Sequence, residues 1–131
     1  MKKLQLVLFC LLLVSCETNP SALLDVGVWG SDTASMSVNE ENASIQFTCA
    51  TGAIPLSIKL DGKNSFKLSG TYSRLSGPPP PDENYSRAFP AIYSGQIKGD
   101  ILELSVMVDS LEIMQNYSLK FGDQTIVPIC P

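Results

Sequence analysis

The chain has 131 residues, enough for one domain of ordinary size. Nine Lys and Arg residues stand against thirteen Asp and Glu residues, and this net charge of −4 argues against binding to nucleic acid or to anionic headgroups. No histidine and no CxxC pair occurs, which excludes a histidine general base and a zinc site. We therefore expect no metal and no cofactor.

The first fifteen residues have the pattern of a secretory signal peptide. Lys2 and Lys3 supply positive charge, and an apolar run from Leu4 to Leu12 follows, broken only by Gln5. As a helix this run rises about 15 Å, roughly half the hydrocarbon core of a membrane, so it is too short to span one. We expect residues 1–15 to be removed from the mature protein.

The expected cleavage site, Leu13-Val14-Ser15-Cys16, resembles the lipobox of bacterial lipoproteins. The resemblance implies that Cys16 becomes the N-terminus and carries acyl chains such as palmitate, which would hold the protein on a membrane almost permanently. Glu17 follows, rather than the aspartate that retains lipoproteins in the inner membrane of enteric bacteria, so the outer membrane is favoured. Residues 16–26 are then a lipidated tether. Without the signal peptide seven basic residues face thirteen acidic ones, a net charge of −6.

From residue 27 onward the hydrophobic pattern has a period of two, which is typical of strands. It predicts eight strands, at 28–38, 45–49, 54–60, 66–72, 93–97, 102–108, 113–121 and 126–129. The separating turns are predicted at 40–42, 51–52, 61–64, 99–100, 110–111 and 122–123. An antiparallel meander hides its edges best by closing on itself. We predict an all-β domain over residues 27–131, a single up-and-down barrel, with a flattened sandwich as the alternative.

Two short turns fix the register of three strands. A two-residue turn at 99–100 pairs Ile92 with Met107, and a two-residue turn at 110–111 pairs Met107 with Met114. The three apolar side chains then form one row across the outer face, where polar side chains are the rule. We predict that this row contacts either the long connecting loop beside it or another protein.

On the inner face at the same end of the barrel, the pattern places Tyr72, Tyr93 and Gln115. A glutamine and two phenols in a barrel mouth could hold a small ligand. The alternative is that they bond to one another and fill the interior together with the other inward aromatic side chains.

The connection Gly77–Pro90 reads GPPPPDENYSRAFP and is too long for a hairpin. Pro78–Pro81 supply no amide donors, so this segment cannot pair as a strand and is expected to be extended. Long loops over a barrel mouth often carry function. The alternative is a solvated insertion without a specific role.

Cys49 and Cys130 are the cysteines that remain after lipidation of Cys16 and loss of the signal peptide. The predicted meander brings both to the same end of the barrel, in a compartment where disulfides persist, so we predict a bridge between them. It would enclose 82 residues and stabilise the fold by up to about 4.5 kcal/mol. The alternative is two unpaired thiols.

The span from Trp29 onward resembles a family of small uncharacterised bacterial secreted proteins and lipoproteins, through IQFTCATGAI at 45–54 and GDILELSV at 99–106. That family implies no activity. Gly27-Val28-Trp29 is similar to the G-x-W motif of lipocalins, which implies a carrier of small apolar ligands. FTCATGAIPLSI at 47–58 is similar to early strands of periplasmic lysozyme inhibitors, although their S-A-S-G-A-R-Y segment does not occur here.

These patterns predict a lipid-anchored, non-enzymatic binding or interaction module of the bacterial cell envelope. The alternatives are a lipocalin-like carrier and a periplasmic inhibitor of a hydrolase such as lysozyme. No spacing of nucleophile and base stands out, so we do not expect an enzyme. The expected partners are the membrane, reached through the lipid on Cys16, and either a protein or a small apolar ligand.

Overall fold

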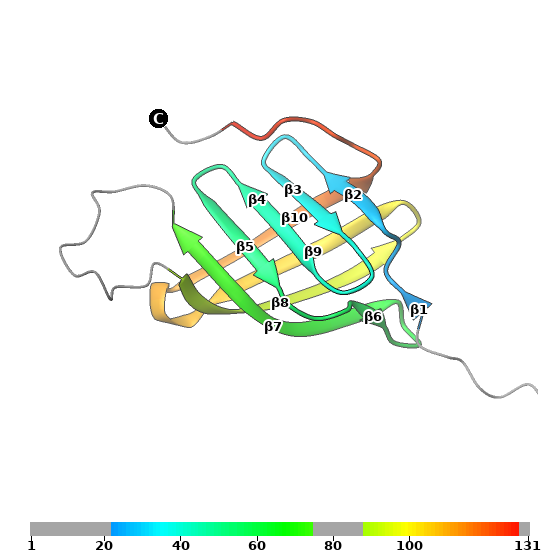
Figure 1. Ribbon diagram of the computed structural model, residues 1–131, viewed down its shortest axis with the longest axis horizontal. Coiled ribbons are helices and arrows are strands. Elements are labelled where there is room, and N and C mark those ends of the chain that lie inside the picture. Colours follow the sequence, from blue (N-terminus) through cyan, green and yellow to red (C-terminus); the bar gives the residue numbers. More distant parts are fainter. Residues whose placement is uncertain (1–21, 75–87, 129–131) are drawn as a thin grey trace, which may run out of the picture.

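The computed structural model describes residues 22–74 and 88–128 of the chain. Its main strands are β2 (Gly27–Gly30), β3 (Ala34–Val38), β4 (Ala43–Phe47), β5 (Ala50–Ile54), β7 (Ser65–Arg74), β8 (Ala88–Lys98), β9 (Ile101–Val108) and β10 (Ile113–Phe121). They close into an antiparallel barrel in the order β10-β2-β3-β4-β5-β7-β8-β9 (Figure 1). The predicted all-β, up-and-down barrel of eight strands is confirmed.

Two short strands, β1 (Ala22–Leu23) and β6 (Lys59–Leu60), pair with each other beside one end of the barrel (Figure 1). The pairing continues in a hydrogen bond from the Leu24 N–H to the Ile58 carbonyl, 2.9 Å long. Leu24 and Ile58 are both buried, so this small sheet covers apolar side chains at that end.

Three of the eight predicted strands are wrong, those at 28–38, 54–60 and 126–129. The predicted strand 28–38 is a hairpin, because the Ser31 hydroxyl oxygen accepts hydrogen bonds from the N–H groups of Thr33 and Ala34, each 3.2 Å long, and closes a turn. The predicted strand 126–129 is irregular over 126–128, the part that the structure describes. The number of strands in the barrel, eight, was right because the error at 28–38 adds a strand and the error at 126–129 removes one.

The turn predicted at Thr51-Gly52 is also wrong, since both residues lie within β5 and the chain reverses at Thr48-Cys49. Gly52 serves the packing instead: it faces the Tyr93 ring, and a side chain there would overlap the phenol oxygen. The predicted barrel strand 54–60 is wrong as well. β5 ends at Ile54, where Pro55 removes a backbone donor, and Lys59–Leu60 form β6 outside the barrel.

Alternate side chains of each long strand fill the barrel. In β9 the side chains of Leu102, Leu104, Val106 and Val108 are fully buried, whereas the residues between them are not. Each Å² of apolar surface buried stabilises the fold by about 25 cal/mol. Burial of one face therefore sets the register, because a slip by one residue would expose all of its apolar side chains. Among the described residues no helix is long and apolar enough to cross a membrane.

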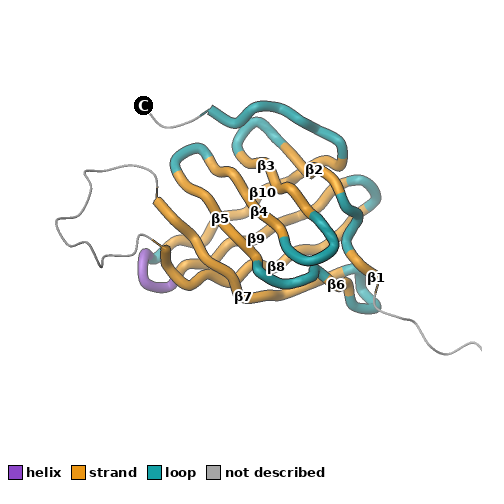
Figure 2. Tube along the Cα trace, viewed as in Figure 1, coloured by secondary structure: helices purple, strands orange, loops and turns teal. Residues whose placement is uncertain are grey.

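The two registers predicted from short turns are confirmed. Lys98 pairs with Ile101 across the two-residue turn Gly99-Asp100, in which Gly99 adopts a φ of 65°. The next turn is longer than predicted: Asp109–Leu111 form a short 3₁₀ turn (purple in Figure 2). Glu112 follows in the left-handed region. Val108 still pairs with Ile113 as predicted, because the turn is longer by one residue on each side, which leaves the register of the two strands unchanged.

Candidate functional site

The predicted outer row exists in the structure. Ile92 pairs with Met107 across β8 and β9, and Met107 pairs with Met114 across β9 and β10. Ile92 and Met107 are half-buried, and Met114 is 72% exposed. Three apolar side chains therefore lie side by side on the outer surface, at the end of the barrel that carries the turn between β9 and β10.

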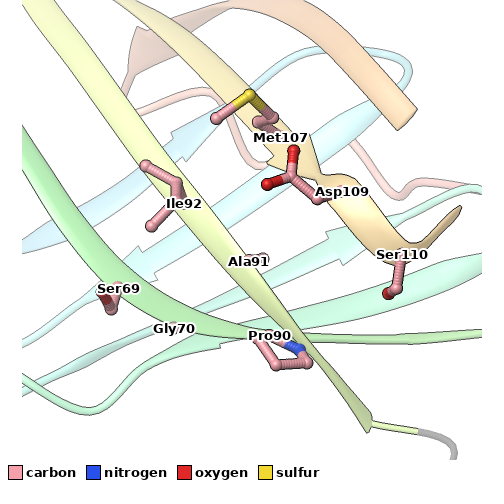
Figure 3. A pocket seen from close by; sticks show the side chains of 8 residues that line it. All are labelled: Ser69, Gly70, Pro90, Ala91, Ile92, Met107, Asp109 and Ser110. Atoms are coloured by element: carbon pink, nitrogen blue, oxygen red, sulfur yellow. The ribbon is translucent and has the colours of Figure 1, made fainter. Parts of the chain in front are cut away.

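A pocket of about 300 Å³ lies beside this row on the outer face of β7, β8 and β9. It is lined by Ser69, Gly70, Pro90, Ala91, Ile92, Met107, Asp109 and Ser110 (Figure 3). Figure 3 shows Ile92 and Met107 on neighbouring strands, with the Asp109 carboxylate close to Met107. The pocket thus combines apolar side chains with an acidic group that a partner could contact.

Sequence reasoning missed Ser69, Pro90, Asp109 and Ser110 as lining residues. Ser69 lies opposite Ile92, but the register of β7 on β8 could not be read because a long connection, not a short turn, joins the two strands. Ser110 was predicted to lie in the turn at 110–111, and Asp109 directly before that turn. The predicted Met107–Met114 pairing already placed both residues near the row. The predicted Pro78–Pro81 segment lies outside the described residues.

Inside the barrel Tyr93 is fully buried, and its hydroxyl donates a 2.6 Å hydrogen bond to the Thr71 carbonyl. Gly52 and Gly70 pack against this side chain, and a Cβ on Gly70 would lie 2.9 Å from its ring. The ring therefore occupies space that two glycines leave open. Glycine is needed at both positions because the backbone lies close to the ring, not because of an unusual backbone conformation.

The other two inner candidates make different contacts from those predicted. Tyr72 packs on Phe47, with ring centroids 5.6 Å apart, and Phe47 also contacts Tyr117 at 5.2 Å. Gln115 is exposed, and its side-chain oxygen accepts a 2.8 Å hydrogen bond from the Tyr117 hydroxyl. Tyr72, Tyr93 and Gln115 thus bond to other groups rather than to one another, and aromatic rings pack together at the mouth.

Burial raises the pKa of all three inward phenols. For Tyr93 the proximity of Tyr72 and Tyr117 adds to the effect of burial, and for Tyr72 the positive charge of Arg74 opposes it in part. These groups remain protonated at neutral pH, and the hydroxyls of Tyr93 and Tyr117 act as hydrogen-bond donors. Their raised pKa values keep the ionised, nucleophilic phenolate form scarce at neutral pH.

After β10 the chain turns at Gly122 and runs along the outer face of β2, β3 and β4. Val127 is buried there, and the segment encloses a second pocket of about 450 Å³ with side chains of the barrel. Asp123 accepts hydrogen bonds from the side chain and the N–H of Thr125, and these bonds lower the pKa of its carboxyl group. The C-terminal segment is therefore attached to the barrel at least as far as Val127.

The C-terminal segment contacts β4, and Cys49 follows that strand. Cys49 lies half-buried in the turn after β4. Among the strands that line the second pocket, β4 is the one farthest along the barrel from β10. Cys130 and Cys16 lie outside the described residues, so the bridge and the lipidation stay predictions.

No three His, Cys, Asp or Glu side chains within residues 22–74 and 88–128 lie close enough together to hold a metal ion. No family model, curated protein or solved structure matches the chain. The resemblances to bacterial lipoproteins, lipocalins and lysozyme inhibitors therefore remain predictions from the sequence.

Proposed function

We propose that the protein is a lipid-anchored module of the bacterial cell envelope, not an enzyme, and that it binds another protein through the outer face of β8, β9 and β10. The observation that carries the proposal is the outer-face row of half-buried Ile92, half-buried Met107 and exposed Met114 beside a pocket. Apolar side chains on the solvent side of a sheet remain in contact with water, and a partner that covers them gains the free energy of their burial.

The pocket gives this surface a shape that a partner side chain can enter. Its volume of about 300 Å³ lies at the lower limit of small-molecule sites, and its opening lies on the surface rather than inside the barrel. Asp109 at its edge favours a partner that presents a basic group next to an apolar one.

The packing of the interior weighs against the lipocalin-like carrier. Tyr93 fills the space left by Gly52 and Gly70, and Phe47 packs between Tyr72 and Tyr117 at the mouth. A ligand inside would have to displace these rings. The absence of histidine from the sequence and the raised pKa values of the phenols support a non-enzymatic role.

The proposed anchor agrees with the position of the pocket. Five residues separate the proposed lipid on Cys16 from β1 at Ala22, a reach of at most about 20 Å. Because β1 lies at the end of the barrel opposite the β9–β10 turn, the tether would hold the row and the pocket facing away from the membrane (Figure 1).

Site-specific photocrosslinking in living cells tests this function. We would place a photoreactive amino acid at Met107, and as a matched control at Gln96, which is exposed on the same outer face of β8 and lies opposite Glu103. We expect a discrete adduct with one protein from position 107 and none from position 96. Equal adducts from both positions, or none from position 107, would contradict the proposal.

A further inference from the structure

The barrel closes through a short contact between β10 and β2. β10 pairs with β9 along its whole length from Ile113 to Lys120, but it pairs with β2 only at Lys120 and Phe121. The rings of Trp29 and Phe121 pack edge to face across this contact, with centroids 4.8 Å apart. Within the part of the chain that the structure describes, residues 113–119 of β10 therefore pair with a strand on the β9 side only, although β3 also lies near β10.

The direction of the backbone groups along this edge follows from two hydrogen bonds. The Phe121 N–H donates to the Asp100 carbonyl at 2.9 Å, toward the β9 side, and the Gly122 N–H donates to the Val28 carbonyl at 2.7 Å, toward β2. Backbone groups alternate in direction along a strand, so odd-numbered residues face β9 and even-numbered ones face away from it. The open side therefore presents the N–H and C=O groups of Met114, Asn116 and Ser118.

Nothing in the sequence of this edge protects it. The stretch IMQNYSL at 113–119 contains no charged residue and no proline, the usual devices that keep an edge strand from pairing. Its outer side chains are held to β9, since the Ser105 hydroxyl donates to the Asn116 side-chain oxygen and the Ser118 hydroxyl donates to Glu103 at 2.8 Å. These bonds keep β10 extended, and they do not engage the backbone groups on its open side.

We propose that this edge of β10 binds an extended peptide segment of the partner protein as an added strand. The inference rests on the proposed function and states how the partner is held. The unpaired groups of Met114, Asn116 and Ser118 form an array that only another extended backbone complements along its length. Because Met114 ends the outer row, an apolar residue opposite it on the added strand would extend the row by one position.

A second copy of the chain fits this edge less well. Two β10 strands paired antiparallel about Asn116 would place each Met114 opposite Ser118 of the other copy, and the apolar row would end in a polar contact. Pairing about Met114 would leave Asn116 and Ser118 beyond the start of the other strand at Ile113.

Hydrogen exchange tests the inference residue by residue. In the ¹⁵N-labelled full-length chain in detergent micelles, we expect fast exchange of the amides of Met114, Asn116 and Ser118 and slow exchange of those of Gln115 and Tyr117. The probe is the end-capped peptide KTVTVTVTK. At about nine times its dissociation constant it should slow exchange of the three even-numbered amides about tenfold, while the same peptide N-methylated on alternate residues should not.

Asn116→Pro removes one donor on the open side, whereas Asn116→Ala keeps it and serves as the matched control. We expect the peptide to protect Met114 and Ser118 in the alanine variant and not in the proline variant. If the proline variant fails to fold, the N-methylated peptide alone decides. Three outcomes would overturn the inference: slow exchange of the even-numbered amides without peptide, no protection on adding it, or protection that grows with protein concentration alone and marks a second copy.

The proposed function can survive the failure of this inference. If a Met107 crosslink to one protein persists unchanged in Asn116→Pro, the outer row binds a partner without the edge. If the peptide protects the edge but Met107 and Gln96 crosslink alike, the edge binds peptides and the proposed function fails.

Discussion

A double-mutant cycle at Gly52 and Tyr93 tests whether the barrel interior is as tightly filled as the proposal requires. A Cβ at position 52 would overlap the Tyr93 hydroxyl oxygen and lie 3.1 Å from the adjacent ring carbon and 3.2 Å from the Phe47 ring. Overpacking of this kind costs about 1–3 kcal/mol, so Gly52→Ala should destabilise the protein by that amount.

The second substitution, Tyr93→Phe, removes the hydrogen bond to the Thr71 carbonyl and should cost about 0.5–1.5 kcal/mol. In the double variant the oxygen that clashes with the methyl group added at position 52 is gone. The stability of the double variant should therefore resemble that of Tyr93→Phe alone, which corresponds to a coupling of about 1 kcal/mol or more.

Urea unfolding measures all four forms, because the single tryptophan, Trp29, is buried and its fluorescence reports exposure of the core. Additive effects of the two substitutions would refute the reasoning, since they would mean that the phenol and residue 52 do not compete for the same space. A Gly52→Ala variant as stable as the natural chain would refute it as well, and would reopen the barrel mouth as a ligand site.

Three further predictions concern the anchor, the bridge and the phenols. Cys16→Ser should abolish incorporation of radiolabelled palmitate, and label in the variant would contradict the lipobox interpretation. Cys49 and Cys130 should resist alkylation until the protein is reduced and unfolded, whereas two thiols that react under native conditions would refute the bridge. Because burial raises the pKa of Tyr93, the unfolded chain loses its phenol protons first, and stability should fall as pH rises above about 10. Absorbance at 295 nm should then show one phenol titrating only on unfolding, and its earlier titration would contradict the packing.

The fold was predictable where the determining signals are local. Gly99-Asp100 is a two-residue turn between alternating apolar residues, and it fixed the partners of Ile92 and Met107. The turn after Val108 was misjudged in length, but burial of one face allows only registers of the same parity. This is why the outer row could be predicted although the loop geometry was not.

The sequence contains evidence for the hairpin of β2 and β3 in the spacing of two inward residues. Trp29 and Met36 are seven positions apart, so in one continuous strand they would face opposite sides, and both can point inward only if a turn separates them. The Ser31 side chain provides that turn.

Other features depend on contacts between distant segments. Val127 is buried because the C-terminal segment packs on the outer face of the barrel, while its neighbour Ile126 is almost fully exposed. Nothing in the local pattern of these residues distinguishes this packing from an eighth strand. The open edge of β10 likewise follows from the shortness of β2, which the turn at Ser31 determines.

The effect of Met107→Lys on crosslinking from Met114 tests the central claim most directly. The lysine side chain would place a charge in the middle of the outer row, while the half-buried position on the outer face should keep the loss of stability below about 1 kcal/mol. We predict that the adduct formed from a photoreactive residue at 114 falls at least tenfold, and that the matched control Gln96→Lys leaves it unchanged. An undiminished adduct in Met107→Lys would contradict the account, and a loss of several kcal/mol in urea unfolding would mean that Met107 belongs to the core.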